Sequence, residues 1–354
     1  MGEYQHSPEN AVRRQVAPSG IDGLLEDIES NPMPEPRDTL CRRSRITGHP
    51  TGKRILLTER DIRWLSALAE HGPLPTSFLL AFGGRSHASE KRARERLTDL
   101  FHETDTPDNG AYLIRPPQQF RTLDSRYNQL VYDLASAGRR ALDRVGPTEG
   151  PRPAPSGPWL HRFMTSCVTA SIELGARARS DLSYIPQSAI LGRAQADLRC
   201  TVTITDPATG YRFDKDLLPD ALFGLRYHTA SGDRFRFFAV EADRATEPTT
   251  SSNWNRKSFE RNLSQYDAYV AGGTYRQHLG LTAPLLVLHV LSDAVRKQRM
   301  VEFVADRYPH GNTFMLFQAW EDFGPVFRPP EPSPALLNGG WVRGGLEPFQ
   351  IDQP

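Results

Sequence analysis

The sequence contains little cysteine and has no long apolar run. Its three cysteines, Cys41, Cys167 and Cys200, are far apart, so neither a disulfide framework nor the paired spacing of a zinc site is present. No apolar run approaches the ~18 residues that a membrane helix needs, and the N-terminus lacks the apolar core of a signal peptide. We therefore expect a cytoplasmic protein without a membrane partner.

Several catalytic motifs are missing as well. None of the ten histidines forms the His-x-His metal triad of HUH relaxases, which also use a nucleophilic tyrosine. The chain has no Walker loop, no Rossmann glycine fingerprint and no serine-centred nucleophile elbow. ATP hydrolysis, dinucleotide chemistry and elbow-type hydrolysis are therefore excluded.

Lysine is scarce, although the formal net charge is only +1. Five of the 43 basic residues are lysine, which leaves 38 arginines. Arginine forks suit phosphate, but high-GC coding produces the same bias and is the simpler explanation. Net charge alone therefore does not indicate a nucleic-acid partner.

The length of 354 residues favours two domains with tails. Residues 1–52 are polar and proline-rich, which predicts a disordered tail. Residues 145–158 are rich in proline and glycine and are expected to form a linker. Residues 323–354 begin with another proline-rich stretch and are expected to be an extended tail. The two folded domains would then be 53–144 and 159–322.

The first of these domains has the pattern of a winged helix-turn-helix. Thr58 is a good N-cap, with Asp61 at the capping-box position, and the apolar face that follows ends near Gly72. The other elements expected here are a short helix over 75–80, a third helix from Ser86, strands over 112–115 and 129–134, and a final helix from near Ser136. Three helices followed by a β-ribbon is the winged-helix order.

The basic residues of this domain are candidates for binding double-stranded DNA. In a winged helix the third helix would enter the major groove, and arginines of the ribbon could reach phosphate. The candidates are Lys91, Arg92, Arg94 and Arg96 on the helix, and Arg121 and Arg126 on the ribbon. A solvated helix face and a protein-binding winged helix are the alternatives that spacing leaves open.

The second domain has an α-β-β-β-α-β order, which makes the chain an α+β or α/β protein of two domains. We expect helices over 161–179, 255–277 and 293–306, and strands over 198–203, 218–226, 234–241, 285–291 and 313–317. The strand over 285–291 is apolar on both faces, which predicts a central position. His161 and His289 are interpreted as core or interface histidines.

Three carboxylates are expected to meet at one end of the sheet. Asp220 opens one strand, and Glu241 and Asp243 close the next, with the last two on the same side. If these strands pair as a hairpin, the carboxylates converge and repel one another unless a cation neutralises them. Mg²⁺ or Mn²⁺ prefers such oxygen ligands and could activate water against a phosphodiester.

The Pro219-Asp220 pair, the triplet Glu241-Ala242-Asp243 and the order of elements resemble the PD-(D/E)xK nuclease superfamily, which has a restriction-endonuclease-like core. With the winged helix and linker, the segments PDALF, EADRATEP and RKSFERNLSQYDAY resemble the replication-relaxation family of mobile elements. That family is similar to MOBC-type conjugative relaxases, which nick DNA at a transfer origin. The resemblance covers roughly residues 55–320.

This resemblance implies roles for individual residues. Asp220 and Glu241 would be metal ligands, and Asp243 would be a third ligand where the superfamily usually has lysine. Lys257, or else Arg244, would supply the missing cation. The supporting residues would be Glu173, which completes the metal shell, and Gln265 and Tyr269, which have the Q-x-x-x-Y spacing of some branches.

Each acidic residue also has a structural interpretation, because Asp220 could form a turn and Glu241 and Asp243 could form salt bridges. Three functions therefore stay open. The first is a DNA nickase or endonuclease of a mobile element, acting in plasmid replication or conjugation with relaxosome or replication proteins. The second is an inactive, nuclease-like accessory factor or regulator that binds DNA, suggested by the aspartate at the lysine position. The third is a protein-assembly adaptor.

Overall fold

The computed structural model describes residues 43–84, 89–146, 158–207, 209–244, 248–250, 254–324 and 326–354. The chain divides into two units, Met1–Arg45 and Ile46–Pro354, and every element described below belongs to the second. Most of the predicted tail and linker, and the expected start of a helix at Ser86, lie outside the described residues.

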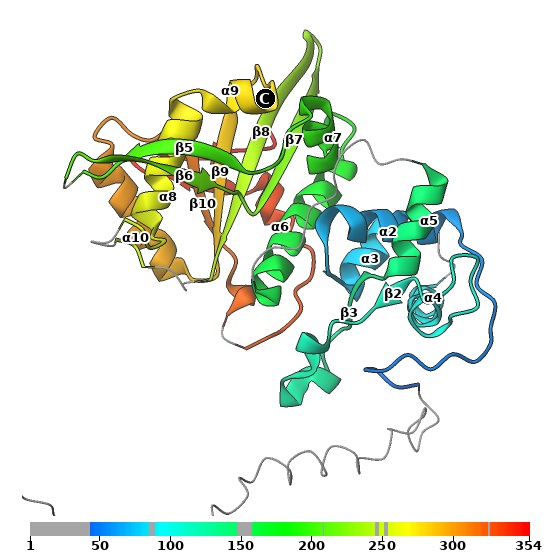
Figure 1. The fold of residues 1–354 in the computed structure, drawn as a ribbon. Helices are drawn as coiled ribbons and strands as arrows, with labels where there is room; N and C mark the ends of the chain where they lie inside the picture. The colour runs from blue at the N-terminus through cyan, green and yellow to red at the C-terminus, as the bar shows by residue number, and fades with distance from the viewer. Residues whose placement is uncertain are drawn as a thin grey trace, which may run out of the picture. The chain divides into compact units, whose positions relative to one another are not determined.

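The first group of elements combines helices with a small antiparallel sheet (Figure 1). In chain order the elements are α2 (Glu59–His71), β1 (Leu74–Pro75), α3 (Thr76–Gly83), α4 (Glu90–His102), β2 (Leu113–Ile114), the 3-10 turns η2 (Pro117–Phe120) and η3 (Leu123–Arg126), β3 (Val131–Leu134) and α5 (Ser136–Val145). The strands have the order β1-β3-β2, with β3 antiparallel to both neighbours. The two-residue strand β1 is an addition to the elements that the sequence predicts.

Local sequence explains where these helices begin. The Thr58 amide donates to Asp61 Oδ2 (2.8 Å) and the Asp61 amide to Thr58 Oγ1 (3.4 Å), so the predicted capping box is confirmed. Ser89 caps α4 by accepting from the Arg92 amide. The apolar face of α4 is buried and consists of Ala93, Leu97, Leu100 and Phe101.

The last residues of the predicted disordered tail are held against the end of α4. The buried Glu103 carboxylate accepts hydrogen bonds from the Thr51 amide (2.8 Å), the Thr51 hydroxyl (2.8 Å) and the Lys53 amide (3.2 Å). The His49 amide donates to His102 Nδ1 (3.0 Å). Residues 46–52 are therefore not a free tail, because these contacts satisfy a buried carboxylate.

The second group of elements is built on a seven-stranded sheet. Its helices are α6 (Trp159–Arg177), α7 (Gln187–Ala194), α8 (Phe259–Tyr266), the π-helical turn η4 (Asp267–Ala271), α9 (Thr274–Leu279), α10 (Ala294–Arg307), the 3-10 turn η5 (Glu321–Phe323) and α11 (Ala335–Asn338). Its strands are β4 (Leu182–Ile185), β5 (Cys200–Thr205), β6 (Arg212–Leu217), β7 (Ala221–Thr229), β8 (Gly232–Asp243), β9 (Leu285–Leu291), β10 (Met315–Ala319), β11 (Gly340–Arg343) and β12 (Leu346–Gln350).

The large sheet is mixed, with the order β12-β11-β10-β9-β8-β7-β4. Strand β9 is parallel to β8 and β10, and the other pairs are antiparallel. All seven residues of β9 are buried, so its predicted central position is confirmed. The mixed α+β class is confirmed too, and α6 packs against β4, β7 and β8.

The predicted strand over 198–203 does not join the large sheet. It corresponds to β5, which pairs with β6 in a separate two-stranded sheet. Only Val202 and Ile204 of β5 are buried, and a strand with one apolar face suits a covering hairpin better than a sheet interior. In the large sheet its place is taken by β4, which with α7 lies in a stretch expected to be irregular. The order is therefore α6, β4, β7, β8, α8, β9.

The single long helix predicted over 255–277 is wrong. Helix α8 begins after Ser258, whose hydroxyl accepts from the Arg261 amide (3.3 Å). The helix then widens into the π-helical turn η4 and ends at Gly272, and Gly273 has a φ of 76°, in the left-handed region. Glycine tolerates this conformation, so the adjacent glycines permit a break before α9.

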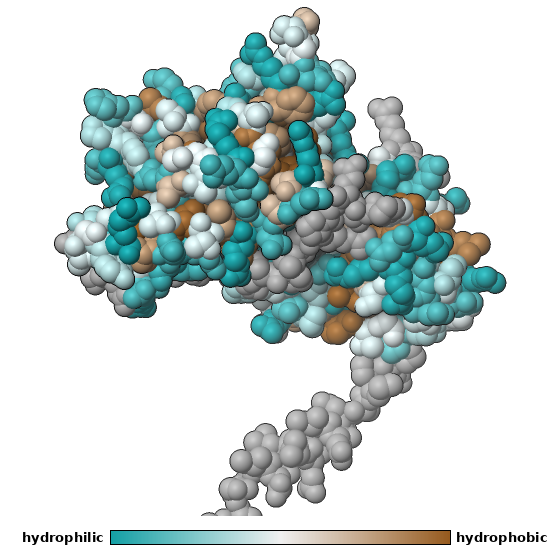
Figure 2. Space-filling view, turned by 45° about the horizontal axis from the view of Figure 1, so that its top comes forward, coloured by the Kyte–Doolittle hydropathy of each residue, from teal (hydrophilic) through white to brown (hydrophobic). Residues whose placement is uncertain are grey.

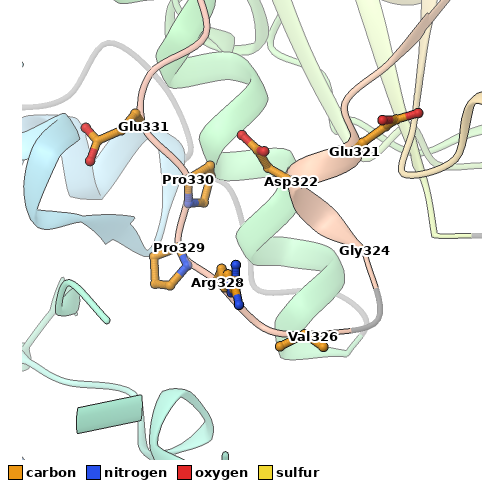
Figure 3. A pocket seen from close by; sticks show the side chains of 8 residues that line it. All are labelled: Glu321, Asp322, Gly324, Val326, Arg328, Pro329, Pro330 and Glu331. Carbon is orange, nitrogen blue, oxygen red and sulfur yellow. The ribbon is translucent and has the colours of Figure 1, made fainter. Parts of the chain in front are cut away.

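The extended tail predicted over 323–354 is also wrong. Strands β11 and β12 complete the large sheet, and the Trp341 side chain is 0% exposed. The Tyr227 hydroxyl donates to the Ile351 carbonyl (2.6 Å), which fixes the end of the chain on β7. Before α11 the chain passes a cavity of about 560 Å³ that several side chains from Glu321 to Glu331 line, close to α6 (Figure 3).

Helix α6 joins the two groups of elements directly. Its Ser166 hydroxyl donates to the His71 carbonyl at the end of α2 (2.5 Å). Next to this contact, Glu70 accepts from the Gln187 amide (2.7 Å) and from the Ser188 hydroxyl (2.8 Å) of α7.

Hydrophilic side chains cover most of the face in Figure 2, with hydrophobic ones in small groups between them. Across the described part of the chain, no helix combines the length and the apolar character needed to span a bilayer.

Candidate functional site

The hairpin of β7 and β8 brings Asp220 next to Glu241. Residue 221 pairs with 240, and the Asp220 amide donates to the Val240 carbonyl (3.0 Å). The Asp220 carboxylate turns back across the hairpin, where its Oδ2 accepts from the Ala242 amide (2.8 Å). The two carboxylates that the sequence places on neighbouring strands therefore lie at the same end of the sheet.

Glu241 is partly buried and is held from α8. Its Oε1 accepts a short hydrogen bond from the Tyr266 hydroxyl, and Asn262 also hydrogen-bonds it. Burial, and next the charge of Asp220, raise the pKa of Glu241 well above its usual range, although Tyr266, Asn262 and the charge of Lys257 act in the opposite direction. The carboxylate pair is thus a place where negative charge is unfavourable unless a cation is close.

His161 is a member of this site that sequence reasoning missed. Its Nε2 lies 2.7 Å from Asp220 Oδ1, and both side chains are partly exposed at the start of α6 and β7. The interpretation of His161 as a core or interface histidine is therefore wrong. No local pattern could reveal the contact, because helical periodicity says nothing about a strand end 59 residues away.

Lys257 lies on the exposed stretch before α8. Its charge lowers the pKa of Glu241, so it is within electrostatic reach of the acidic pair. Lys257 therefore acts on the acidic pair through its charge.

Asp243 is turned to a different partner. Its Oδ2 accepts from Arg296 Nε (3.0 Å) and Nη2 (2.8 Å) of α10, and both side chains are mostly buried. The expected third ligand is thus engaged in a salt bridge at the strand end, which is the structural alternative that the sequence left open.

Glu173 is not part of the acidic site, which corrects its expected place in a metal shell. It faces α2, where its carboxylate lies 2.7 Å from His71 Nε2 and accepts from Arg177 Nε (2.8 Å). Burial raises the pKa of Glu173, but the hydrogen bond and charge of His71, together with Arg177, hold it below its usual value. Glu173 therefore connects α6 to the N-terminal helices.

Gln265 and Tyr269 point away from the acidic pair. Gln265 Nε2 donates to the Asp216 carbonyl (2.9 Å), and the Tyr269 hydroxyl lies 2.7 Å from His278 Nδ1. The tyrosine that reaches Glu241 is Tyr266. The Q-x-x-x-Y spacing thus marks the correct helix but not the residue that contacts the site.

His289, opposite Glu241 on β9, is buried as the sequence predicts. Burial lowers its pKa to about 3, so it is neutral at physiological pH. It stacks on Phe317 (5.0 Å between ring centroids), and its ring also contacts that of Tyr266 (6.4 Å).

The basic candidates of the N-terminal group have different environments. Lys91, Arg92 and Arg94 are exposed on α4, and Arg94 Nη2 lies 2.5 Å from Glu90 Oε1. Arg96, another candidate for DNA contact, is instead held at 2.8 Å by the buried Asp61 of α2. Arg121 and Arg126 are exposed, and Arg126 lies over the Tyr127 ring (4.8 Å to its centroid).

Within the residues that the structure describes, no three His, Cys, Asp or Glu side chains are arranged to hold a metal ion. The candidate site is therefore a pair of carboxylates at one end of the main sheet of a mixed α+β protein. A histidine contacts the pair, and the charge of a lysine reaches it.

The replication-relaxation family model matches residues 65–285, which is more than half of the chain, so this protein belongs to the replication-relaxation family. The match runs from α2 to the start of β9 and includes Asp220, Glu241 and Lys257. The family associates the chain with the replication of mobile elements. A search of the curated proteins found no match, and neither did a search of the solved structures.

Proposed function

We propose that this protein binds double-stranded DNA of a mobile element and cleaves one strand of it at the acidic pair, with a divalent metal ion. The observation that carries the proposal is the convergence of Asp220 and Glu241 within electrostatic reach of Lys257. The order α6, β4, β7, β8, α8, β9 supports it, because it is the α-β-β-β-α-β order of PD-(D/E)xK nucleases.

The residues present fit Mg²⁺ or Mn²⁺. Mg²⁺ is commonly bound by one or two carboxylates, with water and substrate phosphates as its other ligands. Asp220 and Glu241 would hold the ion. Burial, and next the charge of Asp220, raise the pKa of Glu241, so a bound cation would relieve an unfavourable negative charge. When bound, such an ion polarises a phosphodiester and makes its bound water more acidic.

The protein's own groups would prepare and hold this site. Tyr266 and Asn262 fix the Glu241 carboxylate, and His161 fixes that of Asp220. Lys257 would stabilise the negative charge that develops on the phosphate, the role of the lysine that Asp243 replaces. Asp243 would act indirectly, because its salt bridge with Arg296 anchors the end of β8 to α10.

The N-terminal group would bind the duplex. The order α2, β1, α3, α4, β2, β3 and the sheet order β1-β3-β2 support a winged helix, in which α4 would enter the major groove. Lys91, Arg92 and Arg94 are exposed cations of α4, and Arg121 and Arg126 precede β3. Arg96 is withdrawn into the fold and would not reach the DNA.

The test is a nicking assay on supercoiled plasmid that carries the cognate origin. With Mg²⁺ or Mn²⁺ we expect conversion to the open circle by wild type and by Asp214→Ala, a matched carboxylate variant on β6. Asp220→Ala and Glu241→Ala should lose at least about 100-fold in rate. Equal nicking by all four proteins would reject the acidic pair as the site.

A second candidate function is a DNA-binding accessory factor without nuclease activity. The salt bridge of Asp243 to Arg296 favours it, because the usual catalytic lysine is replaced by a residue engaged elsewhere. Salt-sensitive binding of the origin, with no nicking under any metal, would select this function.

A further inference from the structure

The hairpin of β5 and β6 carries an aromatic face that the proposed cleavage site does not use. The Tyr211 side chain is 69% exposed, and its ring stacks on Phe213 with 6.1 Å between centroids and 18° between planes. Lys215 Nζ lies 5.4 Å from the centroid of the Phe213 ring. Phe213 and Lys215 share one side of β6 by strand alternation, and Tyr211, directly before the strand, stacks on that side.

The carboxylates of this strand occupy its other side. Asp214 accepts from the Thr203 hydroxyl (2.6 Å), and Asp216 pairs with Arg199 (2.9 Å). These acidic groups are engaged across the hairpin and do not compete for the aromatic side. The face formed by Tyr211, Phe213 and Lys215 is thus apolar at one end and positive at the other.

The positive end of this face leads toward the acidic pair. Lys215 Nζ donates to the Asn255 side chain (3.0 Å), and the exposed Arg256 and Lys257 follow directly. The charge of Lys257 already reaches Glu241. Along the chain, the five steps from Lys215 to Asp220 span at most ~18 Å. The hairpin packs against α8 (Figure 1), the helix whose Tyr266 contacts Glu241.

We propose that this aromatic face binds single-stranded DNA by stacking its bases on Tyr211, and that the basic stretch through Lys257 guides the backbone to the acidic pair. Aromatic side chains beside a basic track are how proteins hold single strands without reading their sequence. Partly buried Phe213 supports the Tyr211 ring from below. The identification of the bound single strand as DNA rests on the proposed function, whereas the stacking of bases on Tyr211 does not.

The test is fluorescence anisotropy with the full-length protein in EDTA, which prevents cleavage. The probes are a labelled single-stranded oligonucleotide of mixed sequence, about 16 nucleotides long, and the duplex of the same sequence. We expect Tyr211→Ala to weaken single-strand binding by about tenfold or more, and Tyr211→Phe to stay close to wild type because the ring remains.

Two controls separate stacking from other effects. Phe235→Ala removes a different exposed aromatic, on β8, and should leave single-strand affinity unchanged. The second control is wild type in the nicking assay: a wild-type protein that binds single strands through Tyr211 but does not nick with Mg²⁺ or Mn²⁺ would reject the cleavage proposal and keep this one.

The inference is overturned if wild type does not bind the single strand, or if Tyr211→Ala binds it as tightly as wild type. Equal weakening of single-strand and duplex binding by Tyr211→Ala, or by Phe235→Ala, would overturn it too. If Tyr211 binds a protein partner instead, wild type will not bind the single strand, or Tyr211→Ala will bind it as tightly as wild type does.

Discussion

Glu241 shares a partly buried position with a second carboxylate, and its charge opposes folding unless a cation is bound. Because folding raises its pKa, the stability it contributes at low pH is lost as the pH rises through the folded-state pKa. We therefore expect Glu241→Gln to be more stable than wild type at pH 7 in EDTA, by about 1 kcal/mol or more.

Urea unfolding at two pH values checks this expectation. The difference should disappear below about pH 4, where the glutamate is protonated in both the folded and unfolded chain. A Glu241→Gln protein that is less stable than wild type at pH 7 would mean that the carboxylate is already neutralised by the protein itself.

Arg96 and Arg92 are neighbours on α4 with different predicted roles. Arg96→Ala would leave the fully buried Asp61 without its ion-pair partner, so we expect a loss of about 3 kcal/mol in unfolding free energy. Arg92→Ala should change stability by less than about 0.5 kcal/mol but weaken duplex binding. Denaturant titrations and DNA binding on both variants test the pair, and equal stabilities would contradict the structure.

The sequence predicts some of the site residues because their signals are local. Strand alternation and the hairpin place Asp220 beside Glu241, whereas Lys257 is a candidate only through the resemblance to PD-(D/E)xK nucleases. His161 and Tyr266 could not be found in this way, since each depends on how a helix crosses the sheet. Periodicity also cannot show that Arg296 holds Asp243.

At the scale of elements, the sequence predicts helices and strands well where their apolar or capping pattern is strong. Proline content alone is a poor guide to whether a segment folds. The capping box of α2 and the buried strand β9 follow directly from local sequence. Proline content, by contrast, suggested a tail where β11 and β12 complete the sheet. A few prolines before α11 bend the chain but do not stop the apolar residues beyond them from packing.

The folded C-terminal segment yields its own prediction. Trp341→Ala should lower the unfolding free energy by about 3–5 kcal/mol, because the indole is fully buried. Phe349→Ala on β12, where the ring is partly exposed, should cost distinctly less. Thermal unfolding of the full chain measures both, and an unchanged melting temperature for Trp341→Ala would restore the extended-tail interpretation.

At the scale of the whole molecule, a variant of Glu173 tests whether this residue links α6 to the N-terminal helices or binds a metal ion. Its pKa is lowered in the folded state, so its stabilising contribution is present above the unfolded pKa and is lost as the pH falls through the folded pKa. Glu173→Gln should therefore be less stable at pH 7, by about 1.5 kcal/mol, and the gap should narrow at acidic pH. Urea unfolding across this pH range measures the gap, and a gap that does not change with pH would contradict the link to His71.

The most direct test of the central claim is calorimetric titration of Mn²⁺ into the full-length protein and its carboxylate variants. We predict that wild type and Glu173→Gln bind the ion with similar affinity, and that Asp220→Ala and Glu241→Ala lose binding. Wild-type protein that binds no Mn²⁺, or Asp220→Ala and Glu241→Ala variants that bind it as well as wild type, would contradict a metal site at the acidic pair.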